Sequence, residues 1–302
     1  MQALESNVST CPERLDESHL TQFREEGYLV FENVLAPGEV AAARAALTEL
    51  IGGLLKSARQ GEAKVVQADP KKATHNYAGA HIRKANSPFF ILFEPDALDP
   101  LSLDPAEAEL KLRKLQDYHQ EHPVFQAMIG HPRIKGVVET LLGNEAIMFS
   151  DTALSKPPFI GTEKPWHQDN AYFVYVPMAS IVTVWIALDD ATVENGCMHV
   201  IPRGHRMGAL KHVHKVDCQI VQDRLDVSRA VPVELRAGGA MFFSGLLPHQ
   251  SPPNRSPLRR RALQFWYRGA DTRALTREEY SRVFVEADGT PASCAVAERV
   301  AI

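Results

Sequence analysis

The second half of the chain is built from short apolar segments separated by turn-forming residues, and this pattern restricts the fold more than any other feature. The segments are rich in valine, isoleucine, phenylalanine and tryptophan, residue types that favour strands. Turn residues such as Pro157-Pro158, Asn195-Gly196 and Gly238-Gly239 stand between them. Many short strands at this spacing are typical of a β-sandwich or β-barrel. We therefore expect a mainly β core over residues 146–270, with strands in AIMFSDTALS, Trp166 to Val176, SIVTVWIALDD, CMHVIP, AVPVEL, GAMFFSG and RALQFWYR.

The first half has a helical pattern instead. A short helix is expected over residues 15–28, with Asp16 as its cap and Gly27 as its stop, and apolar residues recur at helical spacing from Val40 to Leu55. Residues 105–143 are again helical in character. Residues 58–100 lose this periodicity, which favours a functional loop or lid.

No repeat or linker divides the chain, so one domain over residues 1–302 is the simplest interpretation. We expect its parts to be a loose arm (1–14), a mostly helical support with a lid loop (15–145), a β core (146–270) and a C-terminal tail (271–302).

Composition excludes several classes of function. The formal net charge is −4, so the chain as a whole has no electrostatic case for binding nucleic acid or an anionic membrane. No apolar run approaches the roughly 18 residues of a membrane span, and the N-terminal stretch is polar and acidic. The four cysteines show no paired spacing, which favours reduced thiols. We expect a soluble cytoplasmic protein that acts on a small molecule.

The strongest local motif is His167-Gln168-Asp169. In a strand, the first and third residues of His-x-Asp point to the same face, so an imidazole and a carboxylate can share one metal ion. The motif is weak alone, because it is common by chance. His249, at the end of a later apolar run, would complete a set of two histidines and one carboxylate. Such a set leaves three positions of an octahedral iron open.

The sequence resembles the phytanoyl-CoA dioxygenase family of Fe(II)/2-oxoglutarate-dependent oxygenases. The resemblance lies in WHQDNAYF, in VWIALDDATVENGCMHVIPRGHR, in HQSPPNRSPLRRRALQFWY and in the opening LTQFREEGYLVFENVL. It implies a double-stranded β-helix core (jelly-roll, cupin-like), with N-terminal and inserted helices packed on one sheet. It also implies Fe(II), 2-oxoglutarate and O2 as cofactor and cosubstrates. Residues 58–104 and the tail after about residue 270 match poorly.

The resemblance also implies roles for individual residues. His167, Asp169 and His249 would be the iron ligands, and Arg260 would hold the distal carboxylate of 2-oxoglutarate with help from Ser251. Four further residues are weaker candidates for the cosubstrate pocket. Trp185 could instead be plain core packing, and Lys114 could be a solvated lysine on a helix. Gln168 would face away from the metal in an ideal strand, and Thr152 stands where members of the family often carry methionine.

Three adjacent arginines, Arg259, Arg260 and Arg261, could supply the guanidinium, and strand alternation selects among them. If Arg260 faces the interior, so do Ala262, Gln264 and Trp266. Leu263, Phe265 and Tyr267 then pack outward under the helices. The opposite register would leave the pocket without a polar group for substrate, so the pattern favours Arg260.

Other histidines compete for the metal. His212 and His214 alternate and are followed by Asp217, but their polar surroundings favour a solvated loop. His199 and His205 have no partner at ligand spacing, and we expect structural roles for both.

The substrate leaves few traces in the sequence, and a small organic metabolite is the best expectation. Because halogenating relatives carry Gly or Ala in place of the carboxylate, Asp169 favours hydroxylation or a related oxidation at a C–H bond. A metal-binding barrel without turnover, acting as a sensor or scaffold, is the alternative, and a metal-dependent hydrolase or isomerase is a third. Candidate substrate contacts, for each of which a structural role is an open alternative, are His75, Asn76, Tyr77, His81, Arg83, Phe93, Asn170, Tyr172, Gln264 and Trp266.

Overall fold

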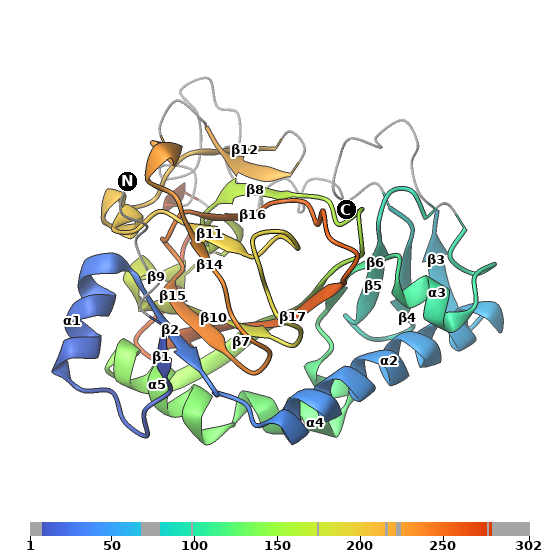
Figure 1. Ribbon diagram of the computed structural model, residues 1–302, viewed down its shortest axis with the longest axis horizontal. Helices are drawn as coiled ribbons and strands as arrows, with labels where there is room; N and C mark the ends of the chain where they lie inside the picture. The colour runs from blue at the N-terminus through green and yellow to red at the C-terminus, as the bar shows by residue number, and fades with distance from the viewer. Residues whose placement is uncertain are drawn as a thin grey trace.

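A ten-stranded sheet dominates the computed structural model, and a four-stranded sheet lies opposite part of it (Figure 1). The structure describes residues 8–67, 79–97, 99–173, 175–214, 217–221, 225–276 and 278–279. His75, Asn76 and Tyr77, most of the predicted tail and the first half of the predicted arm lie outside these residues.

The large sheet joins both halves of the chain. Its strands are, in spatial order, β1 (Val8–Thr10), β2 (Tyr28–Glu32), β15 (Ala240–Ser244), β10 (Ile181–Ala187), β17 (Arg260–Gly269), β7 (Ala146–Lys156), β6 (Leu112–Gln116), β5 (Phe90–Phe93), β4 (His81–Lys84) and β3 (Ala63–Val66). The four-stranded sheet has the order β14 (Val231–Val233), β11 (Met198–Val200), β16 (His249–Ser251) and β8 (Lys164–His167). Two small ladders pair β12 (His212–His214) with β13 (Cys218–Ile220) and β9 (Tyr175–Val176) with β18 (Arg273–Ala274).

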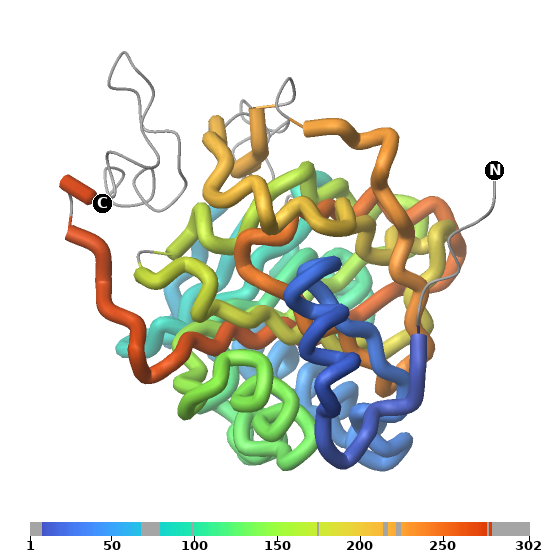
Figure 2. Tube along the Cα trace, turned by 90° about the vertical axis from the view of Figure 1, so that its left-hand side faces the viewer, coloured from blue at the N-terminus to red at the C-terminus, as the bar shows by residue number. Residues whose placement is uncertain are grey.

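The helices gather on one face of the large sheet, beneath it in Figure 1 and at the lower side of the tube in Figure 2. The first of them is capped by Asp16 and ends at Gly27, whose φ of 88° suits glycine, as the sequence predicted. The helical elements are α1 (Glu17–Glu26), α2 (Pro37–Arg59), α3 (Pro105–Glu109), α4 (Pro123–Ile129), α5 (Pro132–Leu142) and the 3-10 turns His119–Glu121, Asp169–Tyr172, Met178–Ser180, Gly204–Met207 and Val227–Arg229.

Alternation along β17 separates two apolar cores. Leu263, Phe265 and Tyr267 are buried in the larger core, which lies between the sheet and α2, α4 and α5. Ala262 belongs instead to a smaller core between the two sheets, together with Trp185. The register predicted for the arginine-rich strand is therefore confirmed.

The helical character predicted for residues 105–143 is confirmed by α3, α4 and α5 but is wrong between them. Residues 112–116 form strand β6, in which Leu112 and Leu115 both face the larger core. Their helical spacing of three arises from an extra residue, because Leu112 and Lys114 oppose the adjacent residues Phe93 and Leu92 of β5. Such a bulge changes the alternation of side chains, so its pattern resembles that of a helix.

Two further expectations are wrong in part. The region expected to be an irregular lid contains β3, β4 and β5, which extend the large sheet beyond β6, so the sheet does not close into a barrel. The predicted loose arm includes β1, which pairs in parallel with β2. The tight turns between β3, β4 and β5 obscured the alternation of their side chains. Strand β1 is too short to show such an alternation.

The described cysteines are also not uniform. Cys11 and Cys197 are buried free thiols, whereas Cys218 is disulfide-bonded, against the expectation of reduced cysteines. None of the helices in the described ranges is long and apolar enough to cross a bilayer.

Candidate metal centre

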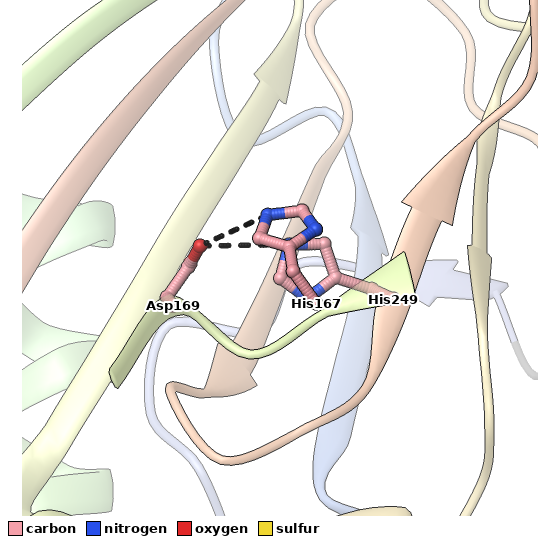
Figure 3. Close-up of side chains that lie close together, drawn as sticks. All are labelled: His167, Asp169 and His249. Atoms are coloured by element: carbon pink, nitrogen blue, oxygen red, sulfur yellow. Dashed lines mark ion pairs between the residues drawn. The ribbon is translucent and has the colours of Figure 1, made fainter. Parts of the chain in front are cut away.

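Three buried side chains converge at the edge of the smaller sheet, where it faces the larger one. His167 Nε2 and His249 Nε2 each lie 3.5 Å from Asp169 Oδ1, and the two imidazole centroids are 4.1 Å apart. Figure 3 shows both rings directed at the same carboxylate oxygen. One ligand atom from each residue falls within 4.8 Å of the others, which is a spacing that one metal ion can bridge.

The backbone explains this convergence. His167, at the end of β8, and His249, at the start of β16, are directly opposite residues in an antiparallel pair. Their side chains therefore share one face of the sheet. The sequence predicted that Asp169 lies in the strand with His167. In the structure it begins the 3-10 turn Asp169–Tyr172 instead. Gln168 keeps an extended conformation, so the same-face relation of His-x-Asp survives although the strand has ended.

Each ligand is held by a hydrogen bond on the side away from the shared point. His167 Nδ1 lies 2.8 Å from the Pro165 carbonyl and His249 Nδ1 2.9 Å from the Leu247 carbonyl, so each ring donates there and presents Nε2. Asp169 Oδ2 accepts from the Thr183 hydroxyl at 2.7 Å, from Trp266 Nε1 at 2.8 Å and from Gln264 Nε2 at 3.3 Å. Asp169 Oδ1 thereby faces the imidazoles.

The electrostatics suit a divalent cation. Burial alone would raise the pKa of Asp169, but His249, His167 and the Thr183 hydroxyl outweigh it and hold that pKa below its ordinary range. Burial, with the neighbouring His167, lowers the pKa of His249 to about 3. A carboxylate that stays charged and an imidazole that stays neutral are the protonation states that a metal requires.

The residue between the ligands is held by the segment 208–212. The Gln168 N–H donates to His212 Nε2 at 3.0 Å, and His212 Nδ1 lies 2.7 Å from the Leu210 carbonyl. The Gln168 amide donates to the Gly208 and Leu246 carbonyls, and it accepts from the Leu210 N–H. The expected contact of Gln168 with the cosubstrate is therefore not supported, because both ends of its amide are used by backbone.

His212 corrects a second expectation. It is fully buried rather than solvated, and burial lowers its pKa to about 3. Its polar neighbours in sequence concealed this position, and the regular alternation His212-Val213-His214 was the signal that could have revealed the strand β12.

Arg260 lies on the face of β17 that also carries Gln264 and Trp266. Its side chain is 1% exposed, its Nη2 donates to the Gly196 carbonyl at 3.1 Å, and its Cζ lies 5.3 Å from the centroid of the Trp185 ring. Burial lowers its pKa to about 10. Its Nε and Nη1 have no hydrogen-bond partner among the described residues. A buried guanidinium with unsatisfied donors fits a carboxylate ligand, which would accept from both.

Sequence reasoning missed Lys156, which pairs directly with Arg260 across β7 and β17. It is 5% exposed and donates to the Thr162 carbonyl at 2.7 Å and to the Ser251 carbonyl at 3.3 Å. Burial first, and then the charge of Arg260, hold its pKa well below the usual range. Lys156 alternates with Thr152 and Leu154, a pattern that could have indicated an inner-face strand position. The two prolines that follow Lys156 indicated a turn instead.

The remaining predicted cosubstrate residues lie on the same inner face. Ser251 and Trp185 are buried, and the Trp185 N–H has no hydrogen-bond partner among the described residues. The Thr152 hydroxyl donates to the Gln116 side chain at 2.7 Å. Lys114 lies on β6 rather than on a helix, two strands from β17, and its ammonium is 5.4 Å from the Phe90 ring centroid.

The predicted substrate residues occupy different parts of the structure. Phe93 is wrong, because it is buried in the larger core on the outer face. Gln264 and Trp266 use their polar atoms on Asp169, and Asn170 donates to the Met178 carbonyl at 2.9 Å. The Tyr172 ring lies 6.0 Å from that of His167, and the Tyr172 hydroxyl contacts Lys164 and Asp217. His81 is half-buried on β4, away from the three ligands.

The phytanoyl-CoA dioxygenase family model matches residues 23–262. Phytanoyl-CoA dioxygenase domain-containing protein 1 of Danio rerio is 26% identical over 260 residues, which cover 83% of this chain and 89% of that protein. Phytanoyl-CoA dioxygenase 1 of Oryza sativa subsp. japonica is 29% identical over 254 residues, covering 82% of this chain and 87% of that one.

Solved structures share the fold. The non-heme alpha ketoglutarate dependent carbocyclase SnoK from nogalamycin biosynthesis has a TM-score of 0.63 at 21% identity, covering 95% of this chain and 96% of that one. EctD from S. alaskensis, solved with 2-oxoglutarate and 5-hydroxyectoine, has a TM-score of 0.62 at 21% identity, covering 93% and 86%. From the family match across most of its length, we conclude that this chain belongs to the phytanoyl-CoA dioxygenase family.

Proposed function

We propose that the protein is an Fe(II)- and 2-oxoglutarate-dependent dioxygenase that hydroxylates, or otherwise oxidises at C–H, a small organic metabolite. One observation carries the proposal: a pre-oriented set of His167, Asp169 and His249 shares the space between the sheets with a buried Arg260 whose Nε and Nη1 have no hydrogen-bond partner among the described residues. A metal site alone would not need that guanidinium. We further propose that the two facing sheets are the halves of a double-stranded β-helix within a single domain.

In this proposal His167 Nε2, His249 Nε2 and Asp169 Oδ1 hold the iron. When bound together with 2-oxoglutarate, iron would activate O2 and couple decarboxylation of the oxo acid to substrate oxidation. The net reaction converts 2-oxoglutarate, O2 and a C–H bond into succinate, CO2 and an alcohol. The protein orients its ligands through the carbonyls of Pro165 and Leu247 and excludes water from the space between the sheets.

Arg260 would hold the distal carboxylate of 2-oxoglutarate through Nε and Nη1. The Ser251 hydroxyl would share that carboxylate, and Trp185 would form one wall beside the guanidinium. Lys156, which lies opposite Arg260, donates to the Ser251 carbonyl and so holds the backbone of Ser251 in place. Lys114 and Thr152, further along the inner face, are proposed to border the same pocket.

Asp169 argues for oxygen transfer rather than halogenation, because it occupies the ligand position that a halide would need. Desaturation, epimerisation and ring formation use the same ligand set, so the proposal names oxidation at C–H and leaves the product class to experiment. The cytoplasmic location expected from the sequence stays a prediction.

A screen of small metabolites that follows 2-oxoglutarate consumption and succinate formation would test this function. The wild-type protein should consume 2-oxoglutarate only with Fe(II) and O2, and the His167→Ala variant should consume none. If no iron preparation turns over while small molecules bind tightly, the protein is a sensor or scaffold instead. Activity that needs the metal but ignores 2-oxoglutarate would point to a hydrolase or isomerase.

A further inference from the structure

Four aromatic side chains form a row of ring contacts that begins beside the candidate metal centre. Trp266 Nε1 donates to Asp169 Oδ2 at 2.8 Å, and the Trp266 ring centroid lies 5.5 Å from that of Phe173. The Phe173 centroid lies 4.7 Å from that of Phe149, which in turn lies 5.1 Å from that of Tyr175. Trp266, Phe173, Phe149 and Tyr175, here called the aromatic row, thus connect a proposed iron ligand with strand β9.

The aromatic row is not part of either main core. The described residues of the larger and the smaller core include none of its members, and each of its side chains is partly exposed. Phe265 and Tyr267, on either side of Trp266 in β17, are by contrast fully buried on the outer face. Successive rings of the row meet at 69°, 85° and 66°, so the edge of one touches the face of the next and parts of the faces stay uncovered. A contiguous group of partly exposed rings favours a binding surface over plain packing.

The rings of the row are held in place by the segments that carry them. Phe173 directly follows the 3-10 turn that Asp169 begins, and its N–H donates to the Asn170 carbonyl at 3.1 Å. Tyr175 belongs to β9, which pairs with β18, and Arg268 Cζ lies 4.9 Å from its ring centroid. Side chains that are already ordered lose little conformational entropy when a ligand binds to them. The aromatic row is therefore a preformed surface.

The aromatic row and the proposed cosubstrate site lie toward opposite ends of β17. Arg260 begins the strand and Trp266 lies six positions later on the same face, which is about 20 Å at the usual rise of a strand. Asp169 accepts from Gln264 and from Trp266, so this ligand lies nearer to the aromatic end than to Arg260. A 2-oxoglutarate molecule held by Arg260 would approach the metal from one side. The aromatic row is then available to a second molecule on the other side.

We propose that the aromatic row binds the substrate, and that this substrate carries a planar, uncharged ring system close to the C–H bond that is oxidised. A planar ring gains from offset stacking and edge-to-face contact with aromatic side chains, in addition to the apolar area that it buries. A flexible aliphatic chain buries apolar area too, but it loses rotational freedom when it binds. This inference rests on the proposed function, because that function makes the molecule beside the metal a substrate.

Calorimetry with 2-naphthol, a planar and uncharged probe, would test the inference on the protein loaded with Mn(II) and 2-oxoglutarate. Phe149→Leu and Phe173→Leu keep an apolar side chain but remove the ring, and each should weaken binding about 2- to 10-fold. Phe90→Leu, the same change at a partly exposed phenylalanine of β5, should leave binding unchanged. The saturated analogue decahydro-2-naphthol and the flexible octan-1-ol should both bind more weakly than 2-naphthol.

A second measurement on the wild-type protein locates the bound probe. Because Mn(II) is paramagnetic, the proton NMR signals of 2-naphthol should broaden strongly in the Mn(II)-loaded protein and not in the Zn(II)-loaded protein. The broadening should vanish in His167→Ala, which lacks a proposed metal ligand. Binding without this broadening would place the ring away from the metal, and octan-1-ol binding as tight as that of 2-naphthol would show that planarity is not recognised. Either result overturns the inference.

The fate of the proposed function is read separately from 2-oxoglutarate consumption with Fe(II). Consumption by a protein that does not bind 2-naphthol would overturn the ring site and retain the oxygenase. Binding of 2-naphthol that depends on Phe173, in a protein that consumes no 2-oxoglutarate, would retain the ring site and contradict the oxygenase.

Discussion

The two faces of the large sheet are made by the same strands but serve different purposes. Along β17, Leu263, Phe265 and Tyr267 face the helices and are fully buried in the larger core. The intervening Gln264 and Trp266 face the smaller sheet and donate to Asp169. A period of two in one strand thus divides the molecule into a packed face and a reactive face.

Buried polar groups occur on both faces of the large sheet. The buried Tyr267 hydroxyl on the outer face donates to the Ile129 carbonyl at 3.0 Å. On the inner face, Arg260 Nε and Nη1 and Trp185 Nε1 have no hydrogen-bond partner among the described residues. The buried Tyr118 hydroxyl in the larger core is also without a partner among those residues, so an unsatisfied donor alone does not distinguish the faces. What distinguishes the inner face is that Arg260 and Trp185 lie beside each other, with two guanidinium donors available to one ligand.

The largest effect should come from Asp169→Ala on the inner face. Loss of a residue that only holds a metal ligand weakens metal binding by up to roughly 100-fold. Loss of the Asp169 carboxylate, a ligand itself, should weaken Fe(II) binding by more than this and should abolish turnover. The apo protein should still unfold in one cooperative transition. Metal titration and denaturant unfolding check both statements. Retention of tight Fe(II) binding would break the division between the faces.

The matching change on the outer face is Phe265→Ala. Because Phe265 is fully buried beneath the helices, its loss should reduce the free energy of unfolding by about 3–5 kcal/mol. Urea unfolding measures this loss, and metal titration of the fraction that remains folded should give the wild-type affinity. A fall in metal affinity parallel to the fall in stability would show that the two faces are coupled.

Arg260→Gln should have an intermediate effect, and its sign on stability should differ from that of Phe265→Ala. Without the guanidinium, the KM for 2-oxoglutarate should rise about 10- to 100-fold, since the loss of a hydrogen bond to a charged group costs about 1.5–3 kcal/mol. Stability should not fall, because the variant buries fewer unsatisfied donors. Oxygen consumption against 2-oxoglutarate concentration measures the first effect and urea unfolding the second. An unchanged KM would remove Arg260 from the cosubstrate site.

The reactive face was more predictable from sequence than the sheet extension. Alternation, which is a local property of a strand, linked His167 with Asp169 and set the register of Arg260, whereas the assignment of His249 came from the resemblance to the family. The strand β6 was misread because a bulge gives Leu112 and Leu115 the spacing of a helix. Local periodicity cannot report an extra residue whose effect appears only against a partner strand.

The burial of single residues was also beyond local patterns. His212 seemed solvated from its polar neighbours, yet it is buried because Gln168, 44 residues earlier in the chain, donates to it. Lys156 is buried between Arg260 and the Ser251 carbonyl, although a lysine before two prolines indicates an exposed turn. Both positions are set by contacts between strands distant in sequence, which a single sequence does not reveal.

The smallest predicted effect compares two adjacent residues of β17, each of which makes one hydrogen bond on its own face. Trp266→Phe removes the donor to Asp169 Oδ2 at 2.8 Å and should weaken Fe(II) binding about tenfold, with little change in stability. Tyr267→Phe removes the donor to the Ile129 carbonyl at 3.0 Å and should lower the free energy of unfolding by about 1 kcal/mol without changing metal affinity. Metal titration and urea unfolding of both variants give four numbers. The two substitutions are adjacent in sequence and each removes one hydrogen-bond donor, so they differ mainly in the face that the side chain occupies. If both variants lost the same metal affinity and the same stability, the two faces would not differ in function.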